Sequence, residues 1–296
     1  MKILPLVSVI MCCYNEQRYI RESIESVLAQ TYNDFEFIIW NDGSTDKTEE
    51  IIKSYNDPRI RYYYHKNTGL GEALRLACQE ANGRYIARID CDDICMPERF
   101  EKQVLFLENH PDYVLCSSGV YYIDAEGKVF GRRFPALKDK DIRRRITAIT
   151  HPATMFRTES YRKAGGYYPL RSAQDRILWS RLLQQGKFAN LMEPLIKYRV
   201  LNNSVSHVIQ ENSIYGNMIE LIRKKICSDL EYNAEDVELH NTIYSLAKRS
   251  FVPTNVSTEY KLSIEEKIYK ISKIFFSENV STSIVYVFKN VYLFFS

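Results

Sequence analysis

The sequence predicts an α/β protein in which a mostly parallel sheet is flanked by helices and followed by a helical C-terminal extension. Strand-like and helix-like segments alternate four times before residue 110, and the connections between them are only a few residues long. Parallel strands joined in this way form right-handed βαβ units, which place helices on both faces of the sheet. After about residue 203 only helical patterns remain, so we expect a separate helical region there.

Four strands are expected in the first half of the chain, and each ends in a polar turn. Apolar residues then recur at helical spacing after every turn. The strands are expected at residues 7–11, 35–40, 59–64 and 85–89, and the turns at 14–16, 41–46, 67–71 and 90–93. The residues that define the four helices are Ile20, Ile24, Val27 and Leu28; Ile51, Ile52 and Tyr55; Leu74, Ala77, Cys78 and Ala81; and Phe100, Val104, Leu105 and Leu107.

The regularity weakens from about residue 121. Residues 121–130 are expected to form a hairpin around the turn 124–127, after a strand at 113–117. The elements expected after the hairpin are a loop and strand at 151–156, a helix after 172–176 and a closing strand at 195–200.

Composition excludes several classes of protein. The 40 basic and 37 acidic side chains give a formal charge of +3, which does not indicate a nucleic-acid partner. The seven cysteines are odd in number and dispersed, which argues against a disulfide framework and indicates a reducing cytoplasm. The apolar run near the N-terminus is too short for a signal peptide, and no apolar window of about 18 residues predicts a transmembrane helix.

The last 30 residues leave two alternatives open. They carry lysines among many Ile, Tyr, Val and Phe residues, so they can lie on a membrane surface as a basic amphipathic segment. Alternatively, they form a helix that packs on its own domain or on a partner chain, as in a homo-oligomer. We therefore expect a cytoplasmic protein, with peripheral contact at the inner face of the plasma membrane as an alternative.

An acidic turn follows the fourth predicted strand. Asp90, Asp92 and Asp93 crowd three carboxylates onto a few residues, and like charges held this close repel unless a cation neutralises them or their pKa values shift. Carboxylate oxygens in a partly open loop suit Mg²⁺ or Mn²⁺. The turn therefore predicts a divalent-metal site that holds a diphosphate. The alternative is a solvated turn that caps the helix opening near Pro97.

The four polar turns are expected to meet. Each follows a strand of the predicted parallel sheet, and ligands in such sheets bind outside the carboxyl ends of the strands. The turns at 14–16, 41–46, 67–71 and 90–93 should therefore converge on one edge.

The chain resembles the family 2 glycosyltransferases, which are inverting enzymes with the Rossmann-like GT-A fold that build bacterial polysaccharides. The resemblance spans roughly residues 6–205, which predicts a GT-A domain at 1–205 and a helical C-terminal region at 206–296. One position departs from the pattern, because Arg75 stands where many relatives have Asn. The segments that carry the resemblance are 7–10, 14–16, 41–46, Asn67 with Gly69, 85–93, 97–100, 151–152, and 174–175 near Trp179.

The resemblance implies roles for individual residues. Tyr14 would pack on the nucleotide base, Asp42 would accept a hydrogen from it, and Asp90 would lie near the ribose. Asp92 would bind the metal, Mn²⁺ or Mg²⁺, with Asp93 nearby. The residues that the resemblance places at the nucleotide-sugar donor are Tyr14, Glu16, Asp42, Asn67, Arg88 and Asp90. The alternatives are that Tyr14 is a half-buried aromatic residue and that Asp42 is a turn former before Gly43.

Asp175 is the candidate catalytic base under this resemblance. Inversion at an anomeric carbon requires an acceptor hydroxyl to lose its proton as it attacks, and a carboxylate within hydrogen-bond reach can take that proton. The alternative for Asp175 is a helix N-cap. His151 would contact the acceptor or shape the pocket, or else serve only as a loop residue.

The sequence therefore predicts a metal-dependent, inverting transfer of a sugar from a nucleotide diphosphate, expected to be a UDP-sugar, to a glycan or lipid-linked acceptor. Two rival functions remain. A nucleotidyltransferase would use a similar sheet and metal, but it usually has an early glycine-rich, basic loop that this chain lacks. A non-catalytic subunit that binds sugar nucleotides would not need Asp90, Asp92 and Asp175 together.

Overall fold

The computed structural model of the protein describes residues 5–133, 139, 142, 149–201, 237, 238 and 241. The chain divides into two units, Met1–Ser204 and Val205–Ser296, and nearly all described residues belong to the first. The helices predicted after residue 203 and the alternatives for the last 30 residues lie outside the described part. The predicted division at residue 205 stays a prediction.

Four parallel strands form the first half of the sheet, as predicted. They are β1 (Val7–Cys13), β2 (Phe35–Asn41), β3 (Ile60–Tyr64) and β4 (Tyr85–Asp90), in the order β3-β2-β1-β4. All residues of β1 and β2 are buried, because helices cover both faces of this part of the sheet. The helices that connect the strands are α1 (Ile20–Leu28), α2 (Thr48–Lys53) and α3 (Leu70–Gln79).

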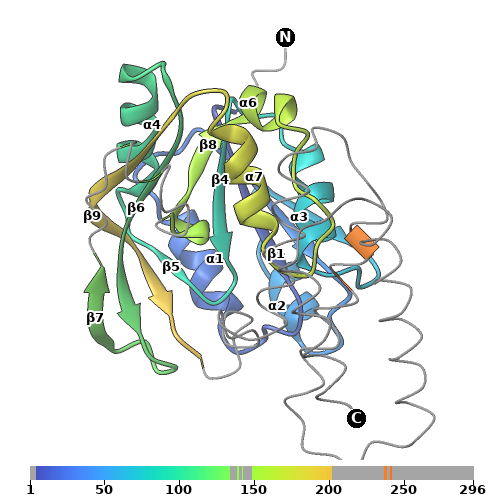
Figure 1. Ribbon diagram of the computed structural model, residues 1–296. Coiled ribbons are helices and arrows are strands. Elements are labelled where there is room, and N and C mark those ends of the chain that lie inside the picture. Colours follow the sequence, from blue (N-terminus) through green and yellow to red (C-terminus); the bar gives the residue numbers. More distant parts are fainter. Residues whose placement is uncertain are drawn as a thin grey trace, which may run out of the picture. The chain divides into compact units, whose positions relative to one another are not determined.

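The second half of the sheet is mixed. Beyond β4 the order continues β8-β6-β9-β5, and β7 pairs with β6 at the side (Figure 1). β6 and β9 are parallel, whereas the pairs β4–β8, β6–β8, β6–β7 and β5–β9 are antiparallel. The elements of this half are β5 (Ile94–Cys95), α4 (Arg99–Asn109), β6 (Tyr113–Ile123), β7 (Val129–Arg133), η2 (His151–Ala153), β8 (Met155–Arg157), α6 (Thr158–Lys163), α7 (Gln174–Leu182) and β9 (Lys187–Arg199).

Two hydrophobic clusters cover the two faces of the sheet. Residues of α1, α2 and α4 pack with one set of strand residues, and residues of α3, α6 and α7 pack with the other. In Figure 1, α7 accordingly lies in front of β4 while α1 lies behind it. Alternate residues of a strand point to opposite faces, so Val9 and Met11 join the first cluster and Ile10 the second. The predicted α/β fold with a flanked sheet is confirmed.

The structure confirms the predicted hairpin and extends two strands. β6 runs for 11 residues and β9 for 13, whereas shorter strands are predicted there. Ser117, Ser118 and Gly119 interrupt the β-branched pattern of β6, yet each pairs with β9, with register shifts on both sides of Gly119. α6 and the two-residue strand β5 are not predicted from the sequence. β5 is too short to show a period, and it exists because it pairs with β9.

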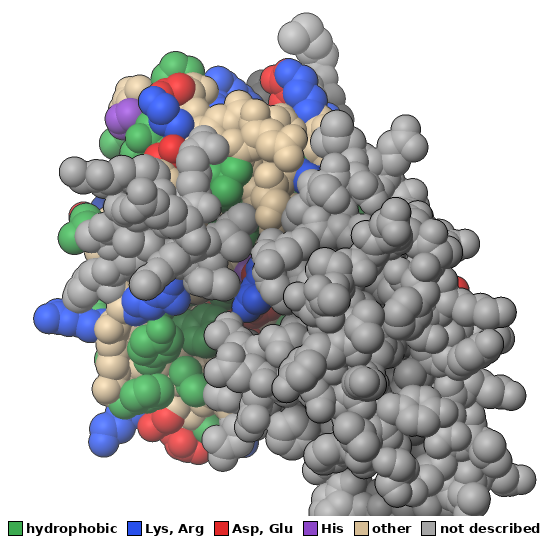
Figure 2. Space-filling model, viewed as in Figure 1, with side chains coloured by type: hydrophobic (Ala, Val, Ile, Leu, Met, Phe, Trp, Pro, Cys, Tyr) green, Lys and Arg blue, Asp and Glu red, His purple; other side chains and the backbone are tan. Residues whose placement is uncertain are grey.

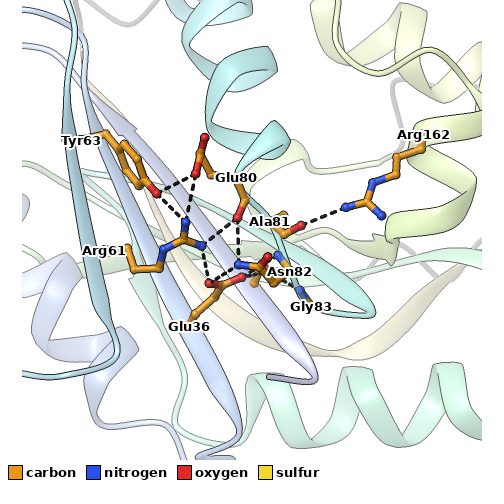
Figure 3. Close-up of polar contacts among 9 residues, drawn as sticks. Glu36, Arg61, Tyr63, Glu80, Ala81, Asn82, Gly83 and Arg162 are labelled. Atoms are coloured by element: carbon orange, nitrogen blue, oxygen red, sulfur yellow. Dashed lines mark hydrogen bonds and ion pairs between the residues drawn. The ribbon is translucent and has the colours of Figure 1, made fainter. Parts of the chain in front are cut away.

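A buried polar network holds the start of β4 (Figure 3). Glu36 of β2 accepts hydrogen bonds from Ser8 Oγ, from the Asn82 N–H and side chain, and from Arg61 Nη1. Arg61 also donates to Glu80 Oε2 at 3.0 Å. The network therefore fastens the turn after α3 to β1, β2 and β3, and so fixes where β4 begins.

The hairpin β6–β7 carries exposed apolar side chains. Val129 and Phe130 of β7 are 47% and 61% exposed, and the Phe130 ring stacks on Tyr122 with 6.2 Å between centroids. Figure 2 shows hydrophobic side chains at the surface in the region of this hairpin, with Lys and Arg side chains around them. Within the described ranges, no helix is long and apolar enough to cross a membrane.

Candidate active site

The four polar turns converge at one edge of the sheet, as predicted. The parallel register pairs Cys13 with Asn41 and Cys12 with Asp90, so β1, β2 and β4 end level with one another. Asn41 also pairs with Tyr64, the last residue of β3. The turns that follow these strands therefore lie side by side outside the carboxyl ends of the sheet, where ligands bind in α/β proteins.

The acidic turn connects β4 to β5. Carboxylate oxygens of Asp90, Asp92 and Asp93 lie within 4.8 Å of one another. The alternative of a helix-capping turn is wrong, because α4 begins only at Arg99 and its N-cap residue Glu98 makes no side-chain cap hydrogen bond. The three carboxylates are thus gathered in a loop and are not used to start a helix.

The charges of this turn and burial raise the pKa of Asp92, Asp93 and the neighbouring Glu16. Burial and the charge of Asp90 raise the pKa of Asp92 to about 6. Burial and the charges of Asp92, Asp90 and Asp46 raise the pKa of Glu16 to about 8. The pKa of Asp93 is raised well above its usual value by burial and by Asp92 and Asp90. The cluster therefore holds negative charge that a cation would stabilise.

The residues of the turn fit a hard divalent cation. Asp93 is 1% exposed, its Oδ1 accepts the Arg199 N–H at 2.8 Å, and its Oδ2 is buried without a hydrogen-bond partner. Oxygen ligands are what Mg²⁺ and Mn²⁺ prefer, and an unpaired buried carboxylate oxygen is costly unless it has such a partner. Asp90 and Asp92, with Asp93 beside them, are the residues that would hold the ion.

Arg88 lies buried beneath the acidic turn. Its side chain is 1% exposed, and Nη2 donates to Asp90 Oδ1. Burial alone would lower the pKa of Arg88, but the neighbouring Asp90 carboxylate raises it, so the residue stays a cation. Its Nε and Nη1 are buried and make no hydrogen bond. Arg88 thus supplies a fixed positive charge next to Asp90.

The first two turns are bonded to each other. The N–H of Asn15, a residue at φ 58°, donates to Ser44 Oγ at 3.0 Å, and its Oδ1 accepts the Thr45 N–H at 2.8 Å. The Glu16 N–H donates to Thr48 Oγ1 at 2.8 Å. Tyr14 is 48% exposed at this edge, so its ring is available to a ligand.

Asp42 holds the third turn in place. Its Oδ1 accepts the N–H and the hydroxyl of Thr68 at 2.9 and 3.0 Å, and its Oδ2 accepts the Gly69 N–H at 2.8 Å. Asn67 donates from Nδ2 to the Asp42 carbonyl at 3.0 Å. A Cβ on Gly43 would lie 2.7 Å from Asn67 N, so this close approach requires glycine. Asp42 therefore does not only form its own turn, as the alternative interpretation predicted, but also binds the backbone of the third turn.

Arg75, the position that departs from the family pattern, is bonded within its own helix. Its Nε and Nη2 donate to the two carboxylate oxygens of Glu72 at 2.7 and 2.6 Å. This pair lies one turn apart on α3, the helix that follows the third polar turn.

Asp175 lies in the first turn of α7, close to the same edge. Its predicted alternative as an N-cap is wrong, because the N-cap is Ala173 in a left-handed conformation at φ 57°. Burial raises the pKa of Asp175, while the Arg176 N–H and the charges of Arg176 and Arg88 lower it in part. The charge of Arg88 lowers the pKa of both Asp175 and Asp92 in part.

His151 packs against Tyr167 and against Trp179 of α7 and does not lie in an exposed loop. Its Nε2 lies 2.7 Å from Tyr167 Oη, and its ring meets that of Trp179 edge-on at 5.6 Å. Burial and the charge of Arg88 lower the pKa of His151 well below its usual value, so the ring is neutral at pH 7. A neutral His151 can accept or donate one hydrogen bond from its second nitrogen.

Two residues that support the acidic turn are not predicted from the sequence. Ser23 of α1 and Arg199 of β9 both hydrogen-bond to it. A serine inside an amphipathic helix and an arginine at the end of a strand carry no local signal for such a role. Only the packing of distant elements reveals them.

The sheet order, the acidic turn after β4 and the carboxylate at the start of α7 define a GT-A glycosyltransferase. The chain belongs to the family described as glycosyl transferase family 2, whose model matches residues 8–165. It is therefore a glycosyltransferase family 2 enzyme, as the sequence indicated.

Known proteins of this kind are similar over most of the described unit. The putative glycosyltransferase EpsE of Bacillus subtilis is 39% identical over 203 residues, which are 66% of this chain and 73% of that protein. The amylovoran biosynthesis glycosyltransferase AmsE of Erwinia amylovora is 32% identical over 230 residues, or 75% of this chain and 86% of that protein. The structure of S. aureus TarS 1–349 in complex with UDP-GlcNAc superposes with a TM-score of 0.63 at 17% identity, over 88% of this chain and 80% of that one, and shows the shared fold.

Proposed function

We propose that the protein is a metal-dependent, inverting glycosyltransferase that moves a sugar from a UDP-sugar to a glycan or lipid-linked acceptor in surface polysaccharide synthesis. The observation that carries this proposal is the cluster of Asp90, Asp92 and Asp93 at the carboxyl edge of the sheet, next to the buried Arg88. Asp175 lies in the first turn of α7, and the charge of the same Arg88 lowers its pKa in part. A diphosphate and a base are both needed at one anomeric carbon, and this arrangement supplies a place for each. The name of the relative AmsE supports the role in polysaccharide synthesis.

The donor would bind along the converging turns. The exposed Tyr14 ring would pack on the base, and the free lone pairs of Asp42 would face the base imide while the Thr68 and Gly69 N–H groups hold its carboxylate. Glu16 and Asn67 would border the nucleotide from the first and third turns. Asp90, oriented by Arg88, would lie near the ribose. The UDP-GlcNAc complex of TarS, which shares the fold, supports a uridine nucleotide.

Mn²⁺ or Mg²⁺ held by Asp92, with Asp93 beside it, would neutralise the diphosphate as it leaves. Asp175 would take the proton from the acceptor hydroxyl. The hydroxyl oxygen then forms the new bond to the anomeric carbon from the side opposite the diphosphate, and the bond to the diphosphate oxygen breaks with its electron pair. Attack from the opposite side inverts the anomeric configuration. The raised pKa of Asp175, caused first by burial, makes this carboxylate a stronger base.

We also propose the division of labour along the chain and its location. Residues 1–205 would form the catalytic GT-A domain, and residues 206–296 a helical region that contacts a membrane or a second copy. A lipid-linked acceptor would place the enzyme in the cytoplasm, at the inner face of the plasma membrane. No nucleic-acid partner is expected, because the charge is nearly balanced.

The test is a panel of nucleotide sugars offered to the full chain with Mn²⁺, with release of UDP as the readout. We expect one UDP-sugar to be turned over and the activity to disappear with a chelator. Asp175→Asn should keep UDP affinity and lose about 10²–10⁴-fold in turnover, because the amide has nearly the same shape but is a far poorer base. Asp112→Asn is the matched control, since Asp112 is paired with Lys187 at the other end of the sheet.

The outcomes separate the rival functions. Near-normal turnover in Asp175→Asn would remove Asp175 from the role of base. Release of pyrophosphate from UTP and a sugar phosphate would indicate a nucleotidyltransferase. UDP binding without turnover of any donor would indicate a non-catalytic subunit.

A further inference from the structure

We propose that Arg199 is a positioning residue that holds the acidic turn in the geometry needed for metal and diphosphate binding and fastens it to the β6–β7 hairpin. This inference rests on the proposed function, because it concerns the same metal site. Arg199 is the last residue of β9, 106 positions away in sequence from Asp93.

The guanidinium of Arg199 joins three elements. Nε donates to the Asp92 carbonyl at 2.8 Å, and Nη2 donates to Glu22 Oε2 of α1 at 2.7 Å. Nη1 donates to the carbonyls of Asp124 and Ala125, in the turn of the hairpin, at 3.0 and 3.1 Å. The side chain is 1% exposed, so these bonds form away from competing water.

The backbone of Arg199 also contacts the turn. Its N–H donates to Asp93 Oδ1 at 2.8 Å. One residue therefore orients the Asp92–Asp93 peptide through the Asp92 carbonyl and the Asp93 carboxylate through its own amide. The Asp93 rotamer set in this way leaves Oδ2 buried and without a hydrogen-bond partner, and Asp93 is one of the three residues whose carboxylate oxygens cluster.

The charge of Arg199 is paired where it lies. Glu22 forms an ion pair with it, and its guanidinium carbon lies 4.5 Å from the centre of the Tyr19 ring. A guanidinium makes these bonds because its donors point in several fixed directions in one plane. A lysine ammonium on a single flexible stem cannot reach the same four acceptors.

The opposite side of the turn is held by α1. Ser23 Oγ lies 2.8 Å from the Cys91 carbonyl and 2.5 Å from the Asp93 carbonyl, and the Cys95 N–H donates to Ser26 Oγ at 3.0 Å. The end of the turn is held by the pairing of β5 with β9, whereas the Arg199 side chain joins Asp92, in the middle of the turn, to the turn of the β6–β7 hairpin. Loss of this side chain should let the carboxylates move relative to one another while the fold remains.

The experiment compares Arg199→Lys with a matched control, Arg157→Lys. Arg157 is also a structural guanidinium that binds several elements, with donors to the Tyr113 and Leu107 carbonyls at 2.9 and 2.7 Å and to Tyr85 Oη at 3.2 Å. It is the last residue of β8 and pairs with Tyr85, the first residue of β4, at the end of that strand away from Asp90. Both variants should therefore lower the melting temperature, whereas only Arg199 contacts the acidic turn.

The experiment has two readouts. Electron paramagnetic resonance of the free ion measures Mn²⁺ affinity, and calorimetry measures UDP affinity in the presence of Mn²⁺. We expect Arg199→Lys to weaken Mn²⁺ binding about 10–100-fold, the range typical for residues that orient metal ligands. Arg157→Lys should bind Mn²⁺ as wild type does. Glu22→Gln, which keeps Arg199 but removes its ion-pair partner, should have a smaller effect in the same direction.

Two results would overturn the role of Arg199 while leaving the proposed function in place. One is an Mn²⁺ affinity of Arg199→Lys equal to that of wild type, and the other is an equal loss of Mn²⁺ affinity in both arginine variants. A wild-type protein that binds neither Mn²⁺ nor UDP would overturn the proposed function, and the role of Arg199 with it.

Discussion

Replacing Glu36 by Gln tests how much the buried network at the start of β4 contributes to stability. Glu36 Oε1 accepts from Ser8 Oγ at 2.6 Å and the Asn82 N–H at 2.7 Å, and Oε2 accepts from Arg61 Nη1 at 2.5 Å and Asn82 Nδ2 at 3.1 Å. Glutamine has nearly the same shape. Whichever oxygen becomes the NH₂ group, it faces two donors, so two hydrogen bonds are lost in either orientation.

The magnitude follows from these contacts. A hydrogen bond to a charged group contributes about 1.5–3 kcal/mol, so two of them set a loss of about 3–6 kcal/mol. Arg61 is 31% exposed and keeps its pair with Glu80, which reduces the loss to about 3 kcal/mol. For a unit of this size that corresponds to a fall of about 6–12 °C in melting temperature.

The pH dependence has a definite sign. Burial would raise the pKa of Glu36, but the hydrogen bonds from Ser8, Asn82 and Arg61 outweigh it and leave the pKa below its ordinary value of 4.5. A carboxylate whose pKa is lowered by folding stabilises the protein above the unfolded-state pKa, and this contribution is lost as the pH falls through the folded-state pKa. The difference in the free energy of unfolding between wild type and Glu36→Gln should therefore be fully present at pH 7. It should shrink as the pH falls below 4.5, the ordinary pKa of a glutamate.

Urea unfolding followed by tryptophan fluorescence is the assay, because Trp40 and Trp179 are the only two tryptophans in the chain and both are buried in the described unit. Glu108→Gln is the control. Glu108 accepts from Arg84 and Tyr85, but its side chain is 36% exposed, so its loss should cost no more than about 1 kcal/mol. Equal losses in the two variants, or a difference that does not change with pH, would refute the reasoning.

Two further predictions concern the site. Asp92→Ala should abolish the dependence of UDP affinity on Mn²⁺, because the charge opposite the diphosphate is removed. Calorimetry measures this affinity. A UDP affinity that neither the variant nor a chelator changes would contradict the metal role. Gly71→Ala should cost about 1–3 kcal/mol and lower turnover more than UDP affinity, since the added Cβ would lie 2.6 Å from Leu170 N, in the segment that leads to Asp175. Gly131→Ala is its control, because the nearest atom to that Cβ is 3.5 Å away, and equal effects would exclude a specific role for the Gly71 contact.

The sequence was sufficient for the first half of the fold and for the acidic turn. Alternating strand and helix periods placed β1 to β4 and the helices between them, and a polar turn after each strand placed Asp42 and Asp90 at one edge. These features are local, since a period and a turn depend on neighbouring residues. The second half was predicted less completely, because β5, β8 and β9 are defined by antiparallel and parallel partners that lie far apart in the chain.

By itself the sequence determined the four βα units, the carboxylates at their carboxyl ends and, through its motifs, the family. Only the tertiary structure decided that Arg199 bonds to the acidic turn, that Arg88 lies buried against Asp90, and that Asp42 bonds to the third turn. The physical reason is distance along the chain. A hydrogen bond between residues 92 and 199 leaves no period or local motif, because it forms only when separate strands and helices pack against one another.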